Sequence, residues 1–267
     1  MEAYKRDLGD KVFFVQTVGR LHSVLFNMLD PGPLQDVRVR KAIALWMDKQ
    51  EAIPAVLGGF GDLYTLLWGT SPWVDPEFRK WPGFSAENKA QDRAEAKRLM
   101  AEAGYANGVE MTTLCRFKWS FKCEWVQAQL AGLSIDLKIE FHDDAIWYER
   151  NRTLGYDMQT MVLCGGTIPE TCRDGMARYS VQPNSWIKHE DAKIDEFFDE
   201  MLNATDLQGR EKAYRALDYY VTVEQAYHVP VWGELQTVPF RSHVKGLQWP
   251  PERPSNNTDY ATVWLEK

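Results

Sequence analysis

The sequence lacks any apolar run that approaches the ~20 residues of a transmembrane helix. Its first ten residues, MEAYKRDLGD, lack the apolar stretch of a secretion signal. Basic residues are in the minority, since 31 Lys and Arg stand against 38 Asp and Glu. Binding to nucleic acid or to an acidic membrane surface needs a basic face. We therefore expect no nucleic acid partner and no membrane insertion of this segment.

Sequence motifs of common enzymes are also absent. There is no GxSxG, no phosphate-binding GxxxxGK[ST] and no HExxH. His142 precedes Asp143 and Asp144, but a helix N-cap explains an acid there more simply than catalysis does. We predict that the chain is not an enzyme and holds neither cofactor nor metal. A small α/β hydrolase, the alternative from another class, would need a nucleophile–base pair that the sequence does not show.

What is present is an alternation of strand and helix patterns over 267 residues, 45% of them apolar. Strands are predicted at 12–18, 23–29, 109–115, 135–141 and 156–163. Helices are predicted at 36–47, 48–57, 86–103, 121–132, 144–153, 191–203 and 207–226. Residues 60–84 have no clean period but several Trp and Pro, which predicts a long ordered loop. The last forty residues are predicted to form short strands and loops.

The β-α-β-α-β order of residues 109–163 predicts an α/β fold, in which helices flank a mostly parallel sheet. Ligands of such sheets bind beyond the carboxyl ends of the strands. Three loops follow predicted strand ends, at 115–121, 142–146 and 164–172. We expect the ligand site among them.

The segment DVRVRKAIALWMDKQEAIPAVLGG at 36–59 follows LFNMLDPGP and precedes AEAKRLMAEAGYANG at 94–108. From about Lys11 to Lys267 the chain resembles the second half of the family 5 extracellular solute-binding proteins of peptide- and nickel-type ABC importers. The resemblance implies a periplasmic-binding-protein-like lobe. Residues 1–30 would be strands on the hinge side, 31–227 the second lobe, and 228–267 a C-terminal segment that returns to a missing first lobe.

The resemblance also implies a function. The lobe would capture a small solute, peptide-like, sugar-like or chelate, and deliver it to the transmembrane permease subunits of an ABC transporter. It would work in the periplasm or at the cell surface on a lipid anchor, and the signal sequence would be absent from this segment. A sensory or interaction module that binds ligand without transport remains the alternative.

The segment YDMQTMVLCGGTIPET at 156–171 matches the ligand loop of the peptide-binding relatives at Tyr156, Asp157 and Cys164. Leu163 stands where those relatives carry an aromatic residue. Gly166 stands where they carry the acid that pairs with the α-amine of a peptide, so we expect a solute without a free amine there. The predicted contacts in this loop are Leu163, Cys164, Gly165, Gly166 and Thr167.

Three further places complete the predicted site. Arg116 and Lys118 could bind an anionic group of the solute at a helix N-terminus, with Trp119 stacked on the solute. A solvated basic loop with Trp119 packed inward is equally open. Asn184 and Trp186 match an element that follows the ligand loop in the relatives. Trp73 resembles a Pro-Trp element of a Trp-rich branch of the family.

Four cysteines fall into two equally spaced pairs, Cys115/Cys123 and Cys164/Cys172. Zinc sites usually show tighter C-x-x-C pairs. An exported protein would allow disulfides. A Cys164–Cys172 bond would hold the ligand loop and a Cys115–Cys123 bond the strand–helix turn. Cross-pairing and four free thiols remain open, because spacing does not give connectivity.

Overall fold

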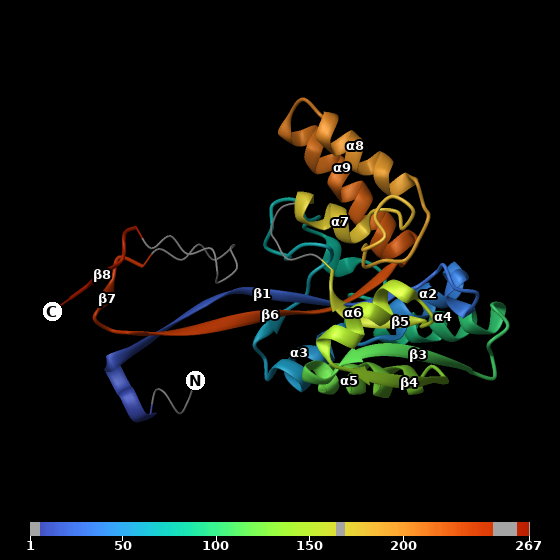
Figure 1. Cartoon of the computed structure of the whole chain (residues 1–267), viewed down its shortest axis with the longest axis horizontal. Helices are drawn as coiled ribbons and strands as arrows, with labels where there is room; N and C mark the ends of the chain where they lie inside the picture. Colours follow the sequence, from blue (N-terminus) through green and yellow to red (C-terminus); the bar gives the residue numbers. More distant parts are fainter. Residues whose placement is uncertain (1–5, 164–168, 248–260, 267) are drawn as a thin grey trace.

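The computed structural model of the chain describes residues 6–163, 169–247 and 261–266 (Figure 1). The strands are β1 (Val12–Phe26), β2 (Gly61–Asp62), β3 (Val109–Arg116), β4 (Ile135–His142), β5 (Met158–Val162), β6 (His228–Arg241), β7 (Val244–Lys245) and β8 (Trp264–Leu265). The helices are α2 (Val37–Trp46), α3 (Lys49–Leu57), α4 (Lys89–Glu102), α5 (Ser120–Ala131), α6 (Asp144–Thr153), α7 (Arg173–Met176), α8 (Lys193–Asn203) and α9 (Leu207–Tyr219). Over these ranges, the helices are all too short or too polar to cross a membrane.

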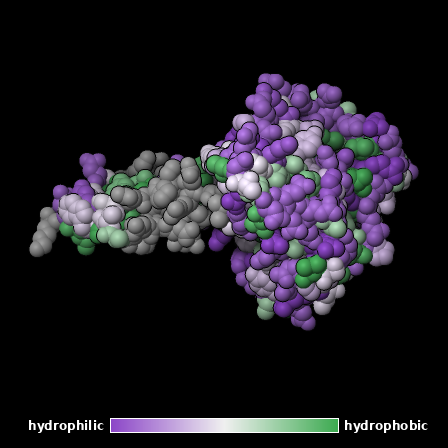
Figure 2. Space-filling model, turned by 90° about the horizontal axis from the view of Figure 1, so that it is seen from above, coloured by the Kyte–Doolittle hydropathy of each residue, from purple (hydrophilic) through white to green (hydrophobic). Residues whose placement is uncertain are grey.

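The molecule consists of a body, built on a six-stranded sheet, and a two-stranded ribbon that leaves it on one side (Figure 1). We define the ribbon as Val12–Val18 of β1 paired with Leu235–Arg241 of β6. Seen from above, the body is rounded and its surface on this side is mostly hydrophilic (Figure 2). Isolated two-stranded ribbons are marginally stable in water, so the ribbon depends on what surrounds it.

The sheet has the strand order β2-β6-β1-β5-β3-β4. β3 is parallel to both β4 and β5, whereas β1 is antiparallel to β5 and to β6, and β2 to β6. It follows that β6, β5, β3 and β4 run in one direction and that β1 and β2 oppose them. The predicted α/β class is confirmed, and the three strands of the β-α-β-α-β segment do share one sheet.

The prediction of two separate strands at 12–18 and 23–29 is wrong. They form the single strand β1, which continues through Gly19 and Arg20. The pairing with β6 shifts register between Val18 and Leu21, so one extra residue of β1 is absorbed as a bulge. A side chain at Gly19 would collide with the backbone oxygen of Glu234 at 2.7 Å, which explains the glycine.

The prediction of short strands after residue 227 is also wrong at β6, which runs for 14 residues. Pro230 and Pro239 lie within it. β2 pairs with β6 only at Gly233 and Glu234, so most of the outer edge of β6 needs no backbone N–H donor. Proline is tolerated at such an edge.

The helix boundaries follow the predicted caps closely. Asp36 accepts the backbone N–H of Arg38 at the start of α2, and Asp48 caps α3 in the same manner. α3 runs on through Pro54 and ends at Leu57. Gly104, at φ +92°, takes the left-handed conformation just beyond α4, which is where glycine commonly ends a helix.

Two hydrophobic cores lie on opposite faces of the sheet. Helices α2 to α5 cover one face, whose core includes Val24, Phe26, Ile43, Val126 and Trp232. Helices α6 to α9 and the 60–84 segment cover the other, whose core includes Leu67, Phe78, Trp147, Phe198 and Tyr214. The 60–84 segment is therefore an ordered part of the core, as its Trp and Pro content predicted. β3 and β5 lie between the two cores and end beside the ribbon.

Candidate functional site

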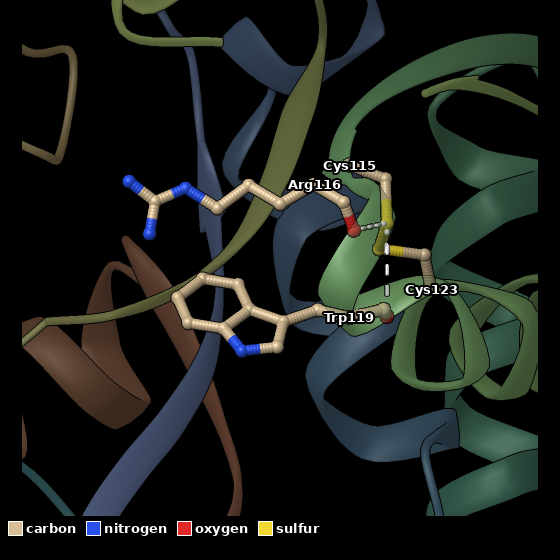
Figure 3. Close-up of a disulfide and its surroundings, with 4 residues drawn as sticks. All are labelled: Cys115, Arg116, Trp119 and Cys123. Carbon is tan, nitrogen blue, oxygen red and sulfur yellow. Dashed lines mark hydrogen bonds between the residues drawn. A yellow bond between two sulfur atoms is a disulfide. The ribbon is translucent and has the colours of Figure 1, made fainter. Parts of the chain in front are cut away.

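The candidate site is built where β3 ends and the chain turns into α5. Cys115 and Cys123 form a disulfide across this turn, with their Cα atoms 6.3 Å apart, so one of the predicted pairings is confirmed. The Cys115 sulfur also lies 3.5 and 3.7 Å from the carbonyl oxygens of Arg116 and Trp119 (Figure 3). A disulfide sulfur has no hydrogen to donate, so these are packing contacts. The bond fixes the backbone from which Arg116 and Trp119 project.

The guanidinium of Arg116 lies among three aromatic rings. Its Cζ atom is 4.8 Å from the ring centre of Trp119, 4.4 Å from that of Trp147 and 4.7 Å from that of Tyr148. Figure 3 shows the guanidinium and the Trp119 indole reaching away from the disulfide on the same side. Cation–π contacts of this kind stabilise a desolvated guanidinium and hold it in place.

Arg116 is only 5% exposed, yet part of its hydrogen-bonding capacity is not used. Among the described residues, Nε and one terminal nitrogen, Nη2, are buried and lack a hydrogen-bond partner. The nearest carboxylate oxygen, on Asp144, is 3.4 Å from Nε, close enough for an ion pair but not aligned for a hydrogen bond. A buried charge with free donors is costly. The arrangement is suited to receive an anionic group.

Asp144 neutralises part of this positive charge from the solvent side. Its carboxylate accepts a hydrogen bond from Lys118 at 2.6 Å and faces Arg116. The hydrogen bond from Lys118, and then the charge of Arg116, hold the pKa of Asp144 below its usual value. Asp143 caps α6 by accepting the backbone N–H of Ile146 at 2.9 Å, as the sequence predicted for one of the two acids.

Trp186 extends the aromatic cluster around Arg116. Its ring centre lies 6.1 Å from that of Trp147 and 6.3 Å from that of Tyr148. Of the predicted site residues, the structure thus brings together Arg116, Trp119 and Trp186. Trp119 is 9% exposed and packs inward, edge-on to His22, so its surface open to a solute is small.

The other predicted contacts that the structure describes are not in this cluster. Leu163 is buried in the core beside Gly175, and Asn184 is exposed. Trp73 packs edge-on against Tyr214 of α9, with ring centres 6.4 Å apart. Four predicted contacts lie outside the described residues: Cys164, Gly165, Gly166 and Thr167. Cys164 is also one partner of the predicted Cys164–Cys172 bond.

Trp147 and Tyr148, whose ring centres lie closest to the guanidinium of Arg116, were not predicted from the sequence. A signal was available, because both lie within the first turns of the helix that follows the 142–146 loop. That loop was one of the three expected at the sheet edge. Their contact with Arg116 depends on β3 and β4 being neighbours, which only the paired strands show.

The sequence profile of the bacterial extracellular solute-binding proteins, family 5 Middle, matches residues 1–171. The chain is 25% identical over 250 residues to the periplasmic oligopeptide-binding protein OppA of Haemophilus influenzae, covering 91% of this chain and 45% of that protein. It is 22% identical over 255 residues to the oligopeptide-binding protein AppA of Bacillus subtilis, covering 87% and 45%.

Solved structures show the same fold. The murein tripeptide binding protein MppA of Escherichia coli superposes with a TM-score of 0.79 at 19% identity, over 100% of this chain and 52% of that one. The chain therefore spans about half the length of the relatives it matches. Because the family profile covers more than half of the sequence, the chain belongs to the bacterial extracellular solute-binding proteins of family 5.

Proposed function

We propose that this chain is the ligand-binding lobe of a solute-binding protein that serves an ABC importer, and that Arg116 binds an anionic group of the solute. The observation that carries the proposal is the guanidinium of Arg116, buried at the carboxyl end of β3 with two nitrogens unpartnered among the described residues. An anion at this position would supply the missing acceptors.

The shape of the site favours capture over chemistry. Arg116 is held by Trp119, Trp147 and Tyr148, of which Trp147 is fully buried and Tyr148 is the ring that a solute could reach. Aromatic walls with a few oriented polar groups are typical of sites that bind small molecules. Tyr148, 40% exposed, forms the outer edge of this site and would be the first ring that a solute meets.

The partners in this proposal are a first lobe and the permease subunits, in the periplasm or at the cell surface. The relatives named above are about twice as long as the part that aligns here. The ribbon leaves the body next to the site, which is where a first lobe would be joined (Figure 1). Two lobes connected in this way can close on a solute and present the closed form to a permease.

The solute class follows from Arg116 and from the sequence of the ligand loop. A carboxylate or another planar anion matches the fork of guanidinium donors. The prediction that the solute has no free α-amine at Gly166 stays a prediction, because that residue lies outside the described ranges. A peptide-like or opine-like acid, or an anionic chelate, would satisfy both conditions.

A thermal-shift screen on the protein with both lobes would test this function, using peptide, sugar and chelate libraries. Each hit would be compared by calorimetry with its neutral counterpart, carboxylate against carboxamide. We expect the carboxylate to bind more tightly, and Arg116→Gln to abolish that preference. Arg150→Gln, which removes a half-exposed arginine paired with Glu140, is the matched control.

The isolated lobe makes a second test. With one side of the cleft missing, about half of the contacts with the solute are lost, so we expect this chain alone to bind the same hits weakly or not at all. Micromolar binding by the chain alone would contradict the two-lobe proposal. Binding by the two-lobe protein without any preference for carboxylates would contradict the role of Arg116.

A further inference from the structure

At the root of the ribbon, three charged or titratable side chains from three different elements meet. His22 comes from β1, Glu234 from β6 and Lys122 from α5. We call this set the root cluster. His22 is completely buried and Lys122 is 3% exposed, whereas the side chain of Glu234 is 20% exposed. The cluster lies where β1 and β6 pass from the body into the ribbon.

Each of the three side chains in the root cluster contacts the other two. The ammonium of Lys122 contacts both the carboxylate of Glu234 and Nε2 of His22, the latter at 2.8 Å. Nε2 of His22 is also 2.9 Å from Oε1 of Glu234. One ammonium therefore joins the two long strands at the point where the bulge in β1 interrupts their regular pairing.

The root cluster pairs a carboxylate with an ammonium whose pKa is lowered by burial, although Glu234 opposes that shift. Burial opposes ionisation of Glu234, but its contacts with His22 and Lys122 lower its pKa to about 2, so it is ionised at neutral pH. Burial lowers the pKa of His22, which is therefore neutral. Nδ1 of His22 has no hydrogen-bond partner among the described residues, which leaves Nε2 as the atom through which the ring is held.

The root cluster also touches the candidate site. His22 packs edge-on against Trp119 with ring centres 5.6 Å apart, and Nζ of Lys122 is 5.7 Å from the centre of the same indole. On its other side, that indole faces the guanidinium of Arg116. Contacts thus run without a break from β6 through Lys122 and Trp119 to the guanidinium.

We propose that Lys122 is a positioning residue, which ties β1 to β6 at the root of the ribbon and holds Trp119 against Arg116. The position of the ribbon and the orientation of the binding guanidinium are then set by one cluster. Packed chains of side chains with alternative arrangements are the physical means by which distant parts of a protein are coupled. The inference rests on the proposed role of Arg116 but concerns the unliganded protein.

Nuclear magnetic resonance of the unliganded chain would test this inference. The Arg116 Nε–H group lies amid three rings, so their ring currents should displace its signal. The signals of Arg116 Nε–H and of the Trp119 indole N–H would be assigned by their loss in Arg116→Lys and Trp119→Phe. We expect Lys122→Met to move the Arg116 signal toward that of exposed arginines and to shift the Trp119 indole. Amide protection from exchange at Leu21–Ser23 and Gly233–Leu235 should fall about ten- to hundred-fold, as expected for the loss of a hydrogen bond to a charged group.

Rescue and control variants separate positioning from general stability. Lys122→Arg should restore both signals. Lys188→Met removes another buried lysine, which donates to the Ser185 carbonyl at 2.7 Å, and should leave both signals in place. If Lys122→Met does not fold, Glu234→Gln tests the same link with less change of shape. Unmoved Arg116 and Trp119 signals in the Lys122 and Glu234 variants would overturn the inference. No ligand is added, so failure to bind a solute would leave this result unaffected.

Discussion

Nε of Arg116 lies 3.4 Å from Oδ1 of Asp144, so the cation proposed to bind the solute already faces a carboxylate of the protein. Asp144 is half-exposed and can turn toward solvent, whereas Arg116 is held by three rings. In the absence of solute, Asp144 stands in for the anion. A solute carboxylate would have to compete with it for Arg116.

Asp144→Asn should therefore tighten the binding of an anionic solute. The substitution keeps the shape of the side chain but removes a negative charge close to the position where the solute anion would bind. Calorimetry with the best carboxylate from the screen, and with its carboxamide, measures the effect. The carboxylate should gain affinity and the carboxamide should not.

Asp136→Asn is the control for that measurement, because this exposed acid pairs with Lys138 at the opposite end of β4. It changes net charge by the same amount but should leave the affinity unaltered. Weaker binding in Asp144→Asn would mean that Asp144 serves mainly to hold Arg116 and Lys118 in place, against the competition argued here.

Removal of the Cys115–Cys123 disulfide should destabilise the chain. The bond closes a short loop, with eight residues of sequence separation. Loop-closure entropy then predicts a loss of about 2.5 kcal/mol in the free energy of unfolding of the Cys115→Ser/Cys123→Ser variant. Urea unfolding without reductant measures it. Each single variant already lacks the bond and should lose nearly as much as the double variant; additive losses would contradict a disulfide between these two residues.

The parts of the fold that were predictable are those set by local physics. Asp36 and Asp48 mark helix starts because a carboxylate there accepts a backbone N–H of the first turn. The alternation of Ile135 and Leu137 with polar residues marks β4, because successive side chains of a strand point to opposite faces of the sheet. The order of strands and helices predicted the α/β class, and the family resemblance predicted the lobe. The position of Arg116 just after a predicted strand made it a candidate for the site.

The parts that were not predictable depend on distant partners. β1 is a single strand because its pairing with β6 resumes after the bulge between Val18 and Leu21. Lys122 is buried because Glu234, 112 residues away in the sequence, lies opposite it. Neither relationship leaves a periodic or compositional trace, so a lysine in an amphipathic helix is naturally interpreted as exposed.

Gly233→Ala should disturb the packing of the body just inside the ribbon. A Cβ atom at this position would lie 2.7 to 3.1 Å from three atoms of the Trp68 ring. Trp68 is almost fully buried and cannot move away without displacing its neighbours. We expect a loss of about 1–3 kcal/mol in the free energy of unfolding, measured by urea denaturation.

Gly32→Ala is the matched glycine control. Its backbone is extended and the new Cβ atom would meet only Asp157 Oδ1, at an ordinary 3.5 Å. The stability should change by less than about 0.5 kcal/mol. Equal losses at Gly233 and Gly32 would show that the contact with Trp68 is not the cause of the loss, because the effect of Gly→Ala on the unfolded chain is stabilising.

Asp218 should make the stability of the chain depend on pH. Its carboxylate is fully buried in α9 and accepts hydrogen bonds from Thr65 at 2.5 Å and Thr222 at 3.1 Å. Burial raises its pKa to about 7, against 3.8 for an exposed aspartate, although these hydrogen bonds oppose the shift. Between those two values the folded state keeps a proton that the unfolded chain has released. The free energy of unfolding should therefore fall as the pH rises from about 4 to about 7, by on the order of 4 kcal/mol from this group.

Asp218→Asn removes the titration while keeping an oxygen acceptor. The difference in unfolding free energy between wild type and variant, measured in urea at several pH values, should favour the wild type most near pH 4 and decline up to about pH 7. Other titrating groups cancel in this difference. Asp199→Asn, at an exposed position on α8, is the matched control for the loss of one charge. A pH-independent difference for Asp218→Asn would mean that Asp218 is ionised in the fold throughout the range, and that Thr65 and Thr222 stabilise the charge more strongly than burial opposes it.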